Sequence, residues 1–453
     1  MLLVSSTIKR FLLSVTGLTL LSAVSAQVNS PFSRYGIGDL YPNQNIASRG
    51  LGGLTAAFSD PQAINSDNPA SYSNIYLTTY DIGISIDSRI LQDNAQGLKY
   101  NSINFSPSYI TLGFPVDKRR KIGMAFGLKP LSQINYSIEQ YSKLPGIDSI
   151  QNLYQGSGGL NQAFIGLGKK WKGLSLGFNT GFNFGKKDIS SKVNILNDTV
   201  KYNGSNSEAN TALWGVFLNA GLQYDLKLKE RSNDLSKTRE IYHLRFGGDV
   251  SVQQKLHANQ NLVKETFNYD VNGAVNPLDV IQQDSSYTGT VSLPASYTAG
   301  LMFVKTIGSS IGELDNWMIG VEYDAARWSQ YRFYDQPDRV RDNWMLRAGF
   351  QITPDPFFAK DFWSRTTYKF GFFTGKDYVD ADGNGLKVEG ITAGAAFHLR
   401  KFRSYGDNQF TLLNTSLEVG KRGSGVNNIT EGFVKFSVGL SLSDVWFIKR
   451  KYD

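Results

Sequence analysis

The sequence predicts an all-β fold: a 14-stranded antiparallel transmembrane β-barrel with an N-terminal plug segment. Two observations carry this prediction. From about Tyr76 onward, apolar residues alternate with small or polar residues in one strand-length run after another. The earlier stretch, Ser30–Leu40 and on to Ala70, is rich in Gly, Asn and Ser and keeps no lasting period. Because a period of two places alternate side chains on one face of a strand, the two regions are expected to fold differently.

The alternating runs favour a membrane barrel over a soluble β-sandwich, which alternates too. Many runs reach about ten residues, as a tilted strand needs to cross a bilayer. Their polar face carries Gly, Asn and single charges, which suits a wet or plugged lumen. The clearest runs are Tyr80–Ile86, Leu174–Phe184, Trp317–Tyr323 and Val434–Leu442. Tryptophans gather near strand ends, as aromatic girdles do: Trp171, Trp317, Trp363 and Trp446 at one rim, Trp214 and Trp344 toward the other.

Fourteen strands can be counted, and the even number agrees with single-chain bacterial barrels. Their approximate spans are 76–90, 99–115, 121–140, 160–170, 173–189, 208–228, 240–257, 294–306, 315–328, 339–353, 364–377, 386–400, 407–421 and 429–444. If both barrel ends face the periplasm, the odd-numbered connections lie outside and include long loops at about 141–159, 190–207 and 258–293. The even-numbered ones are mostly short and basic. Short periplasmic turns and long external loops are typical of such barrels.

The first residues predict export. A basic pair, an apolar run and small residues follow one another, in the order Lys9, Arg10, Phe11–Leu21 and Val24–Ala26. This pattern is typical of a secretory signal peptide, whereas a membrane anchor would be longer. We therefore divide the chain into a signal peptide (1–26), a plug segment (27–75) and a barrel (76–453) in the outer membrane of a Gram-negative bacterium.

Amino-acid composition limits which cofactors and partners the chain can bind. The chain has no cysteine, so it forms neither disulfides nor cysteine metal sites and carries no lipid-modified cysteine. The formal charge of +8 becomes 8 − 2 = +6 once Lys9 and Arg10 are removed with the signal peptide. An exported chain rarely meets nucleic acid, so we expect this basic balance to attract anionic outer-membrane lipid.

Three short motifs within this architecture resemble the FadL family of outer-membrane channels for long-chain fatty acids and other hydrophobic compounds. They are Ala63–Ala70, which ends in Asn-Pro-Ala like the family's plug segment, Leu293–Tyr297 and Trp328–Tyr331. The resemblance implies a passive channel for a small hydrophobic permeant. It also implies that Asn68, Pro69 and Ala70 form a plug motif.

The two ends of the mature chain depart from the classical transporters. The opening Ser30–Gly36 looks more like a divergent branch of the family, and the ending Trp446–Asp453 lacks the common lone aromatic. That branch resembles shuttle or scaffold subunits of outer-membrane machines such as the type IX secretion apparatus. The alternative function is therefore a non-transporting subunit of a multi-protein outer-membrane assembly, for secretion or outer-membrane protein biogenesis. The long external loops would then offer surface to outer-membrane or surface protein partners.

The plug is expected to bind the lumen through polar groups. Buried charges need partners, and Arg34 and Asp39 are the plug's candidates for pairing with lumenal charges. Pro69 disfavours helix at Asn68, so Asn68 should lie in a fixed turn and bond backbone or lumenal groups. A charge ladder for a polar permeant is the alternative. The lumenal charges are Asp81, Asp87, Lys129, Arg245, Asp249, Glu322, Asp324, Arg347, Lys369, Arg400, Glu418 and Lys435.

Two prolines predict an irregularity in the wall. Pro107 stands eleven residues before Lys118 and Pro130 eleven after Arg119, so a regular hairpin places them opposite each other. Proline cannot donate to a β-ladder, so the pair should leave a local gap toward the outer leaflet. The FadL resemblance implies a use for such a gap, because that family is thought to release cargo sideways through a strand kink. Two bulges without a role are the alternative.

We expect no enzymatic activity. There are three histidines, His243, His257 and His398. His243 and His398 fall on polar faces of predicted strands, no nucleophile motif accompanies them, and a lumenal polar role accounts for these two.

One segment matches the first half of a calcium loop. Asp380, Asp382 and Asn384 occupy its first, third and fifth positions and Gly385 its sixth, but Ile391 stands where a bidentate Glu is expected. A hairpin tip rich in Gly and Asp is the alternative. We therefore expect no cofactor, with calcium kept open at these three residues.

Overall fold

The structure is a computed structural model. It describes residues 30–42, 44–94, 97–144, 147–196, 200, 202–233, 238–270, 274–309, 312–359, 361–381, 383–399 and 410–445. The predictions made for residues 1–26, Asp382, Arg400 and Trp446 lie outside the described residues. None of the helices within them is long and apolar enough to cross a membrane.

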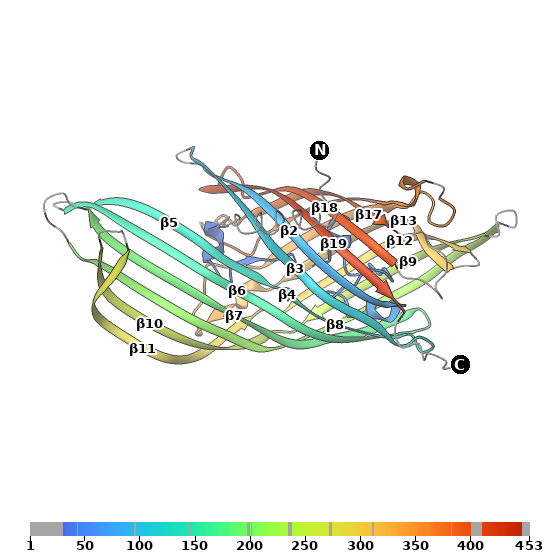
Figure 1. Cartoon of the computed structure of the whole chain (residues 1–453), viewed down its shortest axis with the longest axis horizontal. Coiled ribbons are helices and arrows are strands. Elements are labelled where there is room, and N and C mark those ends of the chain that lie inside the picture. Colours follow the sequence, from blue (N-terminus) through green and yellow to red (C-terminus); the bar gives the residue numbers. More distant parts are fainter. Residues whose placement is uncertain are drawn as a thin grey trace, which may run out of the picture.

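The described strands form one closed antiparallel barrel with 14 strands in its wall, which confirms the predicted fold class (Figure 1). Eleven of them are single elements: β2 (Thr78–Asp93), β3 (Lys99–Asp117), β6 (Ile147–Trp171), β7 (Leu174–Leu196), β8 (Gly204–Asn233), β13 (Gly312–Ala326), β15 (Asn343–Ile352), β16 (Thr367–Lys376), β17 (Lys387–His398), β18 (Phe410–Arg422) and β19 (Ile429–Asp444). The other three are broken into pairs: β4 (Ile122–Pro130) with β5 (Ser132–Leu144), β9 (Thr238–Ser251) with β10 (Gln254–Tyr269), and β11 (Val275–Leu293) with β12 (Ser296–Ser309). Pairing of β19 with β2 closes the ring.

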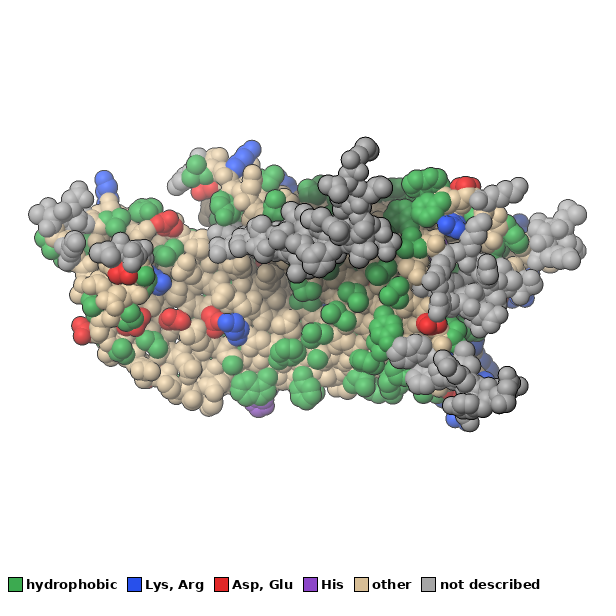
Figure 2. All heavy atoms as spheres, viewed as in Figure 1, with side chains coloured by type: hydrophobic (Ala, Val, Ile, Leu, Met, Phe, Trp, Pro, Cys, Tyr) green, Lys and Arg blue, Asp and Glu red, His purple; other side chains and the backbone are tan. Residues whose placement is uncertain are grey.

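Alternate residues face opposite sides of the wall as the two-residue period predicts. Ile82 and Ile84 are 43% and 41% exposed on the outside, whereas Asp81 before them and Ser85 after them are 1% and 2% exposed. Apolar side chains cover the outer face of the closed part of the barrel, and charged ones lie nearer its ends (Figure 2). The wall therefore presents hydrocarbon to lipid and keeps its polar groups for the interior.

The long external loops predicted at 141–159, 190–207 and 258–293 are wrong, because strands continue through most of these residues. They form the β5–β6, β7–β8 and β10–β11 hairpins. β6, β7 and β8 have 25, 23 and 30 residues, against the roughly 9–11 that cross a bilayer. One side of the wall therefore extends far beyond the rest (Figure 1). Alternation fades in this extension because both of its faces meet water; nearly every residue from Val275 to Tyr287 is exposed.

The N-terminal segment (residues 30–75) lies inside this ring. Its elements are η1 (Pro31–Arg34), β1 (Asp39–Leu40), α2 (Ile46–Arg49) and η2 (Pro69–Asn74). α2 contacts β17, β18 and β19, whereas η2 contacts β3, β4, β6, β7 and β8 on the other side of the ring. Three apolar clusters join the segment to the wall. One contains Phe32 and Ile37 with Leu160 and Leu256, one Leu51 and Phe58 with Met302 and Met318, and one Tyr72 with Phe164 and Phe217.

Three remaining elements connect the strands of the wall. η3 (Trp328–Gln330) and β14 (Arg332–Phe333) lie between β13 and β15, and β14 pairs with the end of β11. η4 (Trp363–Arg365) lies between β15 and β16. Trp171, Trp317 and Trp363 all lie toward the end of the barrel that carries the short turns, as the predicted girdle requires.

Candidate functional site

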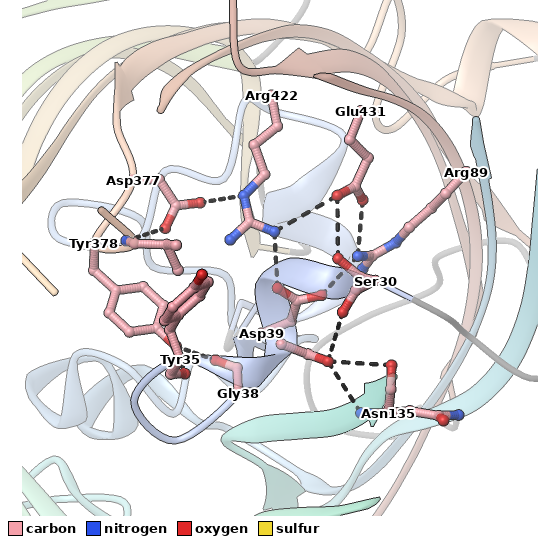
Figure 3. Close-up of polar contacts among 12 residues, drawn as sticks. Ser30, Tyr35, Gly38, Asp39, Arg89, Asn135, Asp377, Tyr378, Arg422 and Glu431 are labelled. Atoms are coloured by element: carbon pink, nitrogen blue, oxygen red, sulfur yellow. Dashed lines mark hydrogen bonds and ion pairs between the residues drawn. The ribbon is translucent and has the colours of Figure 1, made fainter. Parts of the chain in front are cut away.

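A cluster of ion pairs ties the N-terminal segment to the wall, with Asp39 at its centre (Figure 3). One carboxylate oxygen of Asp39 lies 2.8 Å from Arg89 of β2, and the other lies 2.8 Å from Arg422 of β18. The two arginines also reach Glu431 of β19, at 2.8 and 3.7 Å. Arg422 additionally lies 2.6 Å from Asp377. Asp39 thus pairs with lumenal charges as predicted, and its two partners lie on β2 and β18 of the wall.

Burial and charge act in opposite directions on Asp39. Burial alone would raise the pKa of its carboxyl, but the Arg422 and Arg89 guanidiniums outweigh that effect and hold the pKa below its usual range. The Asp39 carboxylate is therefore charged at neutral pH. Breaking its pairs would leave buried charges without partners, which is far more costly than never burying them.

The opening motif Ser30–Gly36 is held against the same cluster. The Ser30 hydroxyl donates to Glu431 at 3.3 Å, and the Phe32 ring lies 4.7 Å from the Arg422 guanidinium carbon. The Tyr378 hydroxyl donates to the carbonyls of Tyr35, at 3.1 Å, and Gly38. The motif that distinguishes this chain from classical FadL transporters is thus the part that contacts the ion pairs.

Arg34, the other charge expected to pair, lies elsewhere. Its side chain is exposed, and its guanidinium carbon lies 4.8 Å from the centroid of the Tyr154 ring of β6. A different residue of the segment pairs with a lumenal charge: Asp67 lies 2.8 Å from Lys129 of β4.

Asn68 holds the far end of the segment. Its side-chain amide donates to the carbonyls of Ala56 (2.6 Å), Leu222 (3.1 Å) and Gly248 (3.3 Å). Its side-chain oxygen accepts from the Ala70 N–H and caps η2, of which Pro69 is the first residue. Asn68 and Ala70 are both 0% exposed. A single amide therefore links three parts of the chain: the segment, β8 and β9.

The wall is interrupted beside Pro107 and Pro130. The β3–β4 ladder ends at Ile110 opposite Leu128, two and three residues short of Pro130 and Pro107. Beyond that point β3 pairs only with β2 among the described strands, and β5 with β6 and β1.

Tyr41 occupies the interruption. Its N–H donates to the Leu131 carbonyl at 2.8 Å, and its hydroxyl lies 2.6 Å from the Ser106 hydroxyl of β3. Asp39 and Leu40 add a short strand to the edge of β5 at Gln133 and Ser132. The N-terminal segment thus fills the space between β3 and β5.

The half calcium motif lies in the β16–β17 connection. Asp380 accepts from the Gly385 N–H at 3.1 Å and lies 3.6 Å from Arg341, and Asn384 donates to the Val426 carbonyl at 3.4 Å. No group of three His, Cys, Asp or Glu that could hold a metal occurs within the described part of the chain. Calcium at this connection stays a prediction.

Several residues of the cluster escaped the sequence prediction. Arg89 lies two positions after Asp87 and Arg422 four positions after Glu418, so both continue the two-residue period of the predicted lumenal residues. Glu431 similarly continues the period from Lys435. Carrying the alternation to the ends of each strand would have found all three. Arg49 lies outside the strands and has no such signal, although it donates to Ser85 at 2.8 Å in the lumen.

Two cavities flank the N-terminal segment and share no residue. One, of about 470 Å³, lies on the side of the ion cluster and is bordered by Asp39, Arg89, Asp249, Arg347 and Arg422, among other residues. The other, of about 620 Å³, lies toward the short turns and is bordered by Asp60 and Gln62. The first cavity is rich in charge, which is unlike the mostly apolar pocket of a site for hydrophobic ligands.

Comparison with known proteins shows the family to which this chain belongs and the folds that it resembles. The family model described as BamG matches residues 7–453. The fold is similar to that of a Pseudomonas aeruginosa FadL homologue, with a TM-score of 0.53, 12% identity, and coverage of 91% of this chain and 100% of the other. It is also similar to the Ralstonia pickettii toluene transporter TbuX, with a TM-score of 0.51, 14% identity, and coverage of 88% and 98%. No curated protein matches. This chain belongs to the BamG family, and it is a divergent FadL-like barrel of the Gram-negative outer membrane.

Proposed function

We propose that this protein is a non-transporting barrel subunit of a multi-protein outer-membrane assembly that serves secretion or outer-membrane protein biogenesis. The observation that carries the proposal is the attachment of the N-terminal segment to the wall all around the lumen. Asp39 joins it to β2 and β18, Asn68 joins it to β8 and β9, and apolar clusters fill the space between. A segment bonded at so many points seals the barrel. The BamG family assignment supports the same reading.

The extended side of the wall supports a role in assembly. A transporter of small molecules has no need of strands of 25 and 30 residues, which carry the sheet tens of ångströms past the bilayer at about 3.3 Å per residue. A sheet exposed on both faces offers area to a protein partner. We expect no enzymatic activity.

Purification in a mild detergent tests this proposal. Membranes from cells that carry the tagged chain at its native level would be solubilised, and the complex sized and its subunits quantified. Stoichiometric partners together with no ion conductance in planar bilayers are the expected result. A lone, stable barrel, or one that conducts steadily, would contradict the proposal.

The second candidate function is the passive channel for small hydrophobic compounds. The interrupted β3–β4 ladder beside Pro107 and Pro130 favours it, because a break in the wall is where an apolar molecule could pass sideways into lipid. Tyr41 would then have to move, since it links Leu131 to Ser106.

Crosslinking across the interruption distinguishes this candidate. The chain has no cysteine, so Ser106→Cys together with Leu131→Cys gives a unique thiol pair for a short bismaleimide. A channel would lose uptake of labelled fatty acid or toluene after crosslinking while the barrel stays folded. Uptake equal to that of a deletion strain, before any crosslinking, would instead exclude the channel.

A further inference from the structure

The cavity toward the short turns carries an inference that the proposed function does not contain. It has a volume of about 620 Å³ and lies between residues 59–62 and 73–76 of the N-terminal segment and the wall. The β3–β4 turn borders its mouth, and the sequence predicts that this end faces the periplasm. The cavity is large enough for a ligand of several residues.

The charged side chains on one side of the cavity already pair with one another. Asp225 of β8 lies 2.8 Å from His243 and 3.4 Å from Arg245, and Arg245 also lies 3.4 Å from Asp315. Lys170 approaches Asp225 at 3.9 Å. These groups balance one another, so they form a fixed charged wall and require no ligand.

A second group of buried side chains in the cavity lining, here called its floor, has polar atoms without hydrogen bonds. Among the residues that the structure describes, the side-chain nitrogen of Gln62 and the side-chain oxygen of Gln351 have no hydrogen-bond partner, although the two residues are only 6% and 7% exposed. Arg365 Nε and His398 Nδ1, which border the same cavity, are also buried and have no partner within that part of the chain. Buried polar groups are nearly always bonded, because each one left without a partner destabilises the folded state. The lining of the cavity therefore includes an unbonded amide donor, an unbonded amide acceptor and the Arg365 cation.

The rim adds apolar surface and charges of both signs. Its carboxylates Asp117 and Glu313 pair with Arg120 and Arg239, which lie outside the cavity lining. Ile75, Ile122 and Phe357 border the cavity, and so do Lys118 and Lys121 of the β3–β4 turn. Neither lysine has a carboxylate within 4.0 Å among the residues that the structure describes. An alkyl chain would leave the amide floor unbonded, whereas a peptide presents a carbonyl to Gln62 and an N–H to Gln351. A carboxylate on that peptide would satisfy Arg365 and the lysines.

We propose that this cavity binds an extended, acidic peptide segment of a partner protein. The proposal rests on the proposed function and adds to it where the partner docks and by which chemistry. Gln62 and Gln351 contact the peptide backbone, Arg365 contacts its carboxylate, and the apolar rim takes the flanking side chains.

Two peptide pools test the proposal on the purified full-length protein in detergent. Both are pools of fluorescein-labelled nine-residue peptides with randomised flanks, and they differ only in a fixed central Glu or Lys. We expect the Glu pool to bind about tenfold or more tightly, because a charge-assisted bond contributes more than 1.4 kcal/mol. Gln62→Ala and Gln351→Ala should each weaken binding up to about tenfold, and Arg365→Ala should abolish the preference for Glu.

The matched control is Arg119→Ala, which removes a cation from the same β3–β4 turn but outside the cavity. Its binding should equal that of the wild type. Equal binding of both pools, no binding at all, or an equal loss in the control would overturn the proposal, as for a cavity that holds only water. If the protein then still purifies with stoichiometric partners, the proposed function stands without this site. If peptides bind but no partner purifies, the site stands and the assembly role fails.

Discussion

The two ends of the N-terminal segment are attached to the wall by different physical means. Residues 30–42 are held by the ion pairs of Asp39, whose partners also pair with one another. Residues 64–75 are held by the Asn68 amide, by the buried Tyr72 ring and by close backbone contact. The first attachment combines these buried charges with the apolar packing of Phe32 and Ile37, and removing one charged group should weaken it. The second depends on fit, and it responds to lost bonds or added atoms.

Glycines in the wall make the second attachment possible. A Cβ at Gly123 of β4 would lie 1.9 Å from the Tyr72 carbonyl oxygen, and one at Gly247 of β9 would lie 2.0 Å from the Ala56 carbonyl oxygen. No other residue allows the backbone of the segment to approach the wall so closely. Lumenal glycines that looked like simple polar-face spacers thus mark where the segment lies.

The largest predicted effect is that of Arg422→Ala. It leaves Asp39, Asp377 and Glu431 with Arg89 as the remaining arginine of the cluster (Figure 3). Removing one partner of a buried ion pair costs about 3–5 kcal/mol. Residues 30–42 should therefore become accessible, and proteinase K should cut them more than a hundredfold faster, as mapped by mass spectrometry.

Lys421→Ala is the control for this prediction, because it removes an exposed charge from the adjacent position of β18. It should leave the cleavage rate unchanged. A comparable rate for the two variants would mean that the ion cluster does not hold the first half of the segment.

The next largest effect is expected for Asn68→Ala in the second half. This change takes the Asn68 donor from the carbonyls of Leu222 and Gly248, whereas the Ala56 carbonyl keeps the Gln223 side-chain amide at 2.9 Å. Each group left unbonded costs about 1–3 kcal/mol. The segment should loosen at η2, and entry of small antibiotics into cells should rise. Unchanged permeability together with unchanged protease resistance would contradict a sealing role for Asn68.

Asn68→Asp sharpens this test. It keeps the oxygen that caps η2 but replaces the donor with a charge facing three carbonyls, so it should be at least as damaging as alanine. A mild effect of Asp would show that the cap, rather than the amide donor, is what matters.

The sequence predicts the wall far better than the lumen, for a physical reason. Alternation is a local property, so runs such as Tyr80–Ile86 reveal each strand and its two faces. The ion cluster joins Asp39 to residues 50 and 383 positions away, and no spacing rule connects them. The close contacts at Gly123 and Gly247 likewise depend on where the segment lies after folding.

The orientation of two wall arginines could have been predicted from the sequence, whereas the extended hairpins between β5 and β11 could not. Arg89 and Arg422 stand on faces already read as lumenal, so the alternation contained their orientation but not their partners. The β5–β11 extension could not be recognised in the same way, because strands with water on both faces carry no apolar period. Only the tertiary pairing of these strands shows that they are part of the sheet.

A smaller effect distinguishes the two attachments by their response to acid. The pKa of Asp39 lies below its usual range, so its contribution to stability is fully present above about pH 4 and is lost as the pH falls through the folded value. Asp60 behaves oppositely: burial raises its pKa, and charging it as the pH rises costs stability. Lowering the pH from 7 should therefore tighten residues 59–62 before it loosens residues 30–42.

Hydrogen exchange measures this difference, after correction for the intrinsic pH dependence of the amides. In the wild type the Gln62 N–H donates to the Asp60 carboxylate at 2.8 Å. Asp60→Asn keeps an acceptor for this N–H but removes the titrating group, so it should abolish the gain in protection. Further acidification should release residues 30–42 in both proteins. Loss of protection at residues 30–42 before the gain at residues 59–62 would show that another group controls the first attachment.

The smallest predicted effect is that of Arg34→Ala, and it tests whether every charge of the opening motif matters. Arg34 is exposed and stacks on Tyr154, and an exposed cation–π contact contributes about 0.5–1 kcal/mol. Cleavage of residues 30–42 should thus accelerate no more than about fivefold. In a double-mutant cycle, Tyr154→Leu should cost a similar amount and Arg34→Ala should add nothing to it, because both remove the same contact. If Arg34→Ala instead matches Arg422→Ala, positive charge throughout the opening motif holds the segment, and the contrast between a buried ionic attachment and an exposed contact fails.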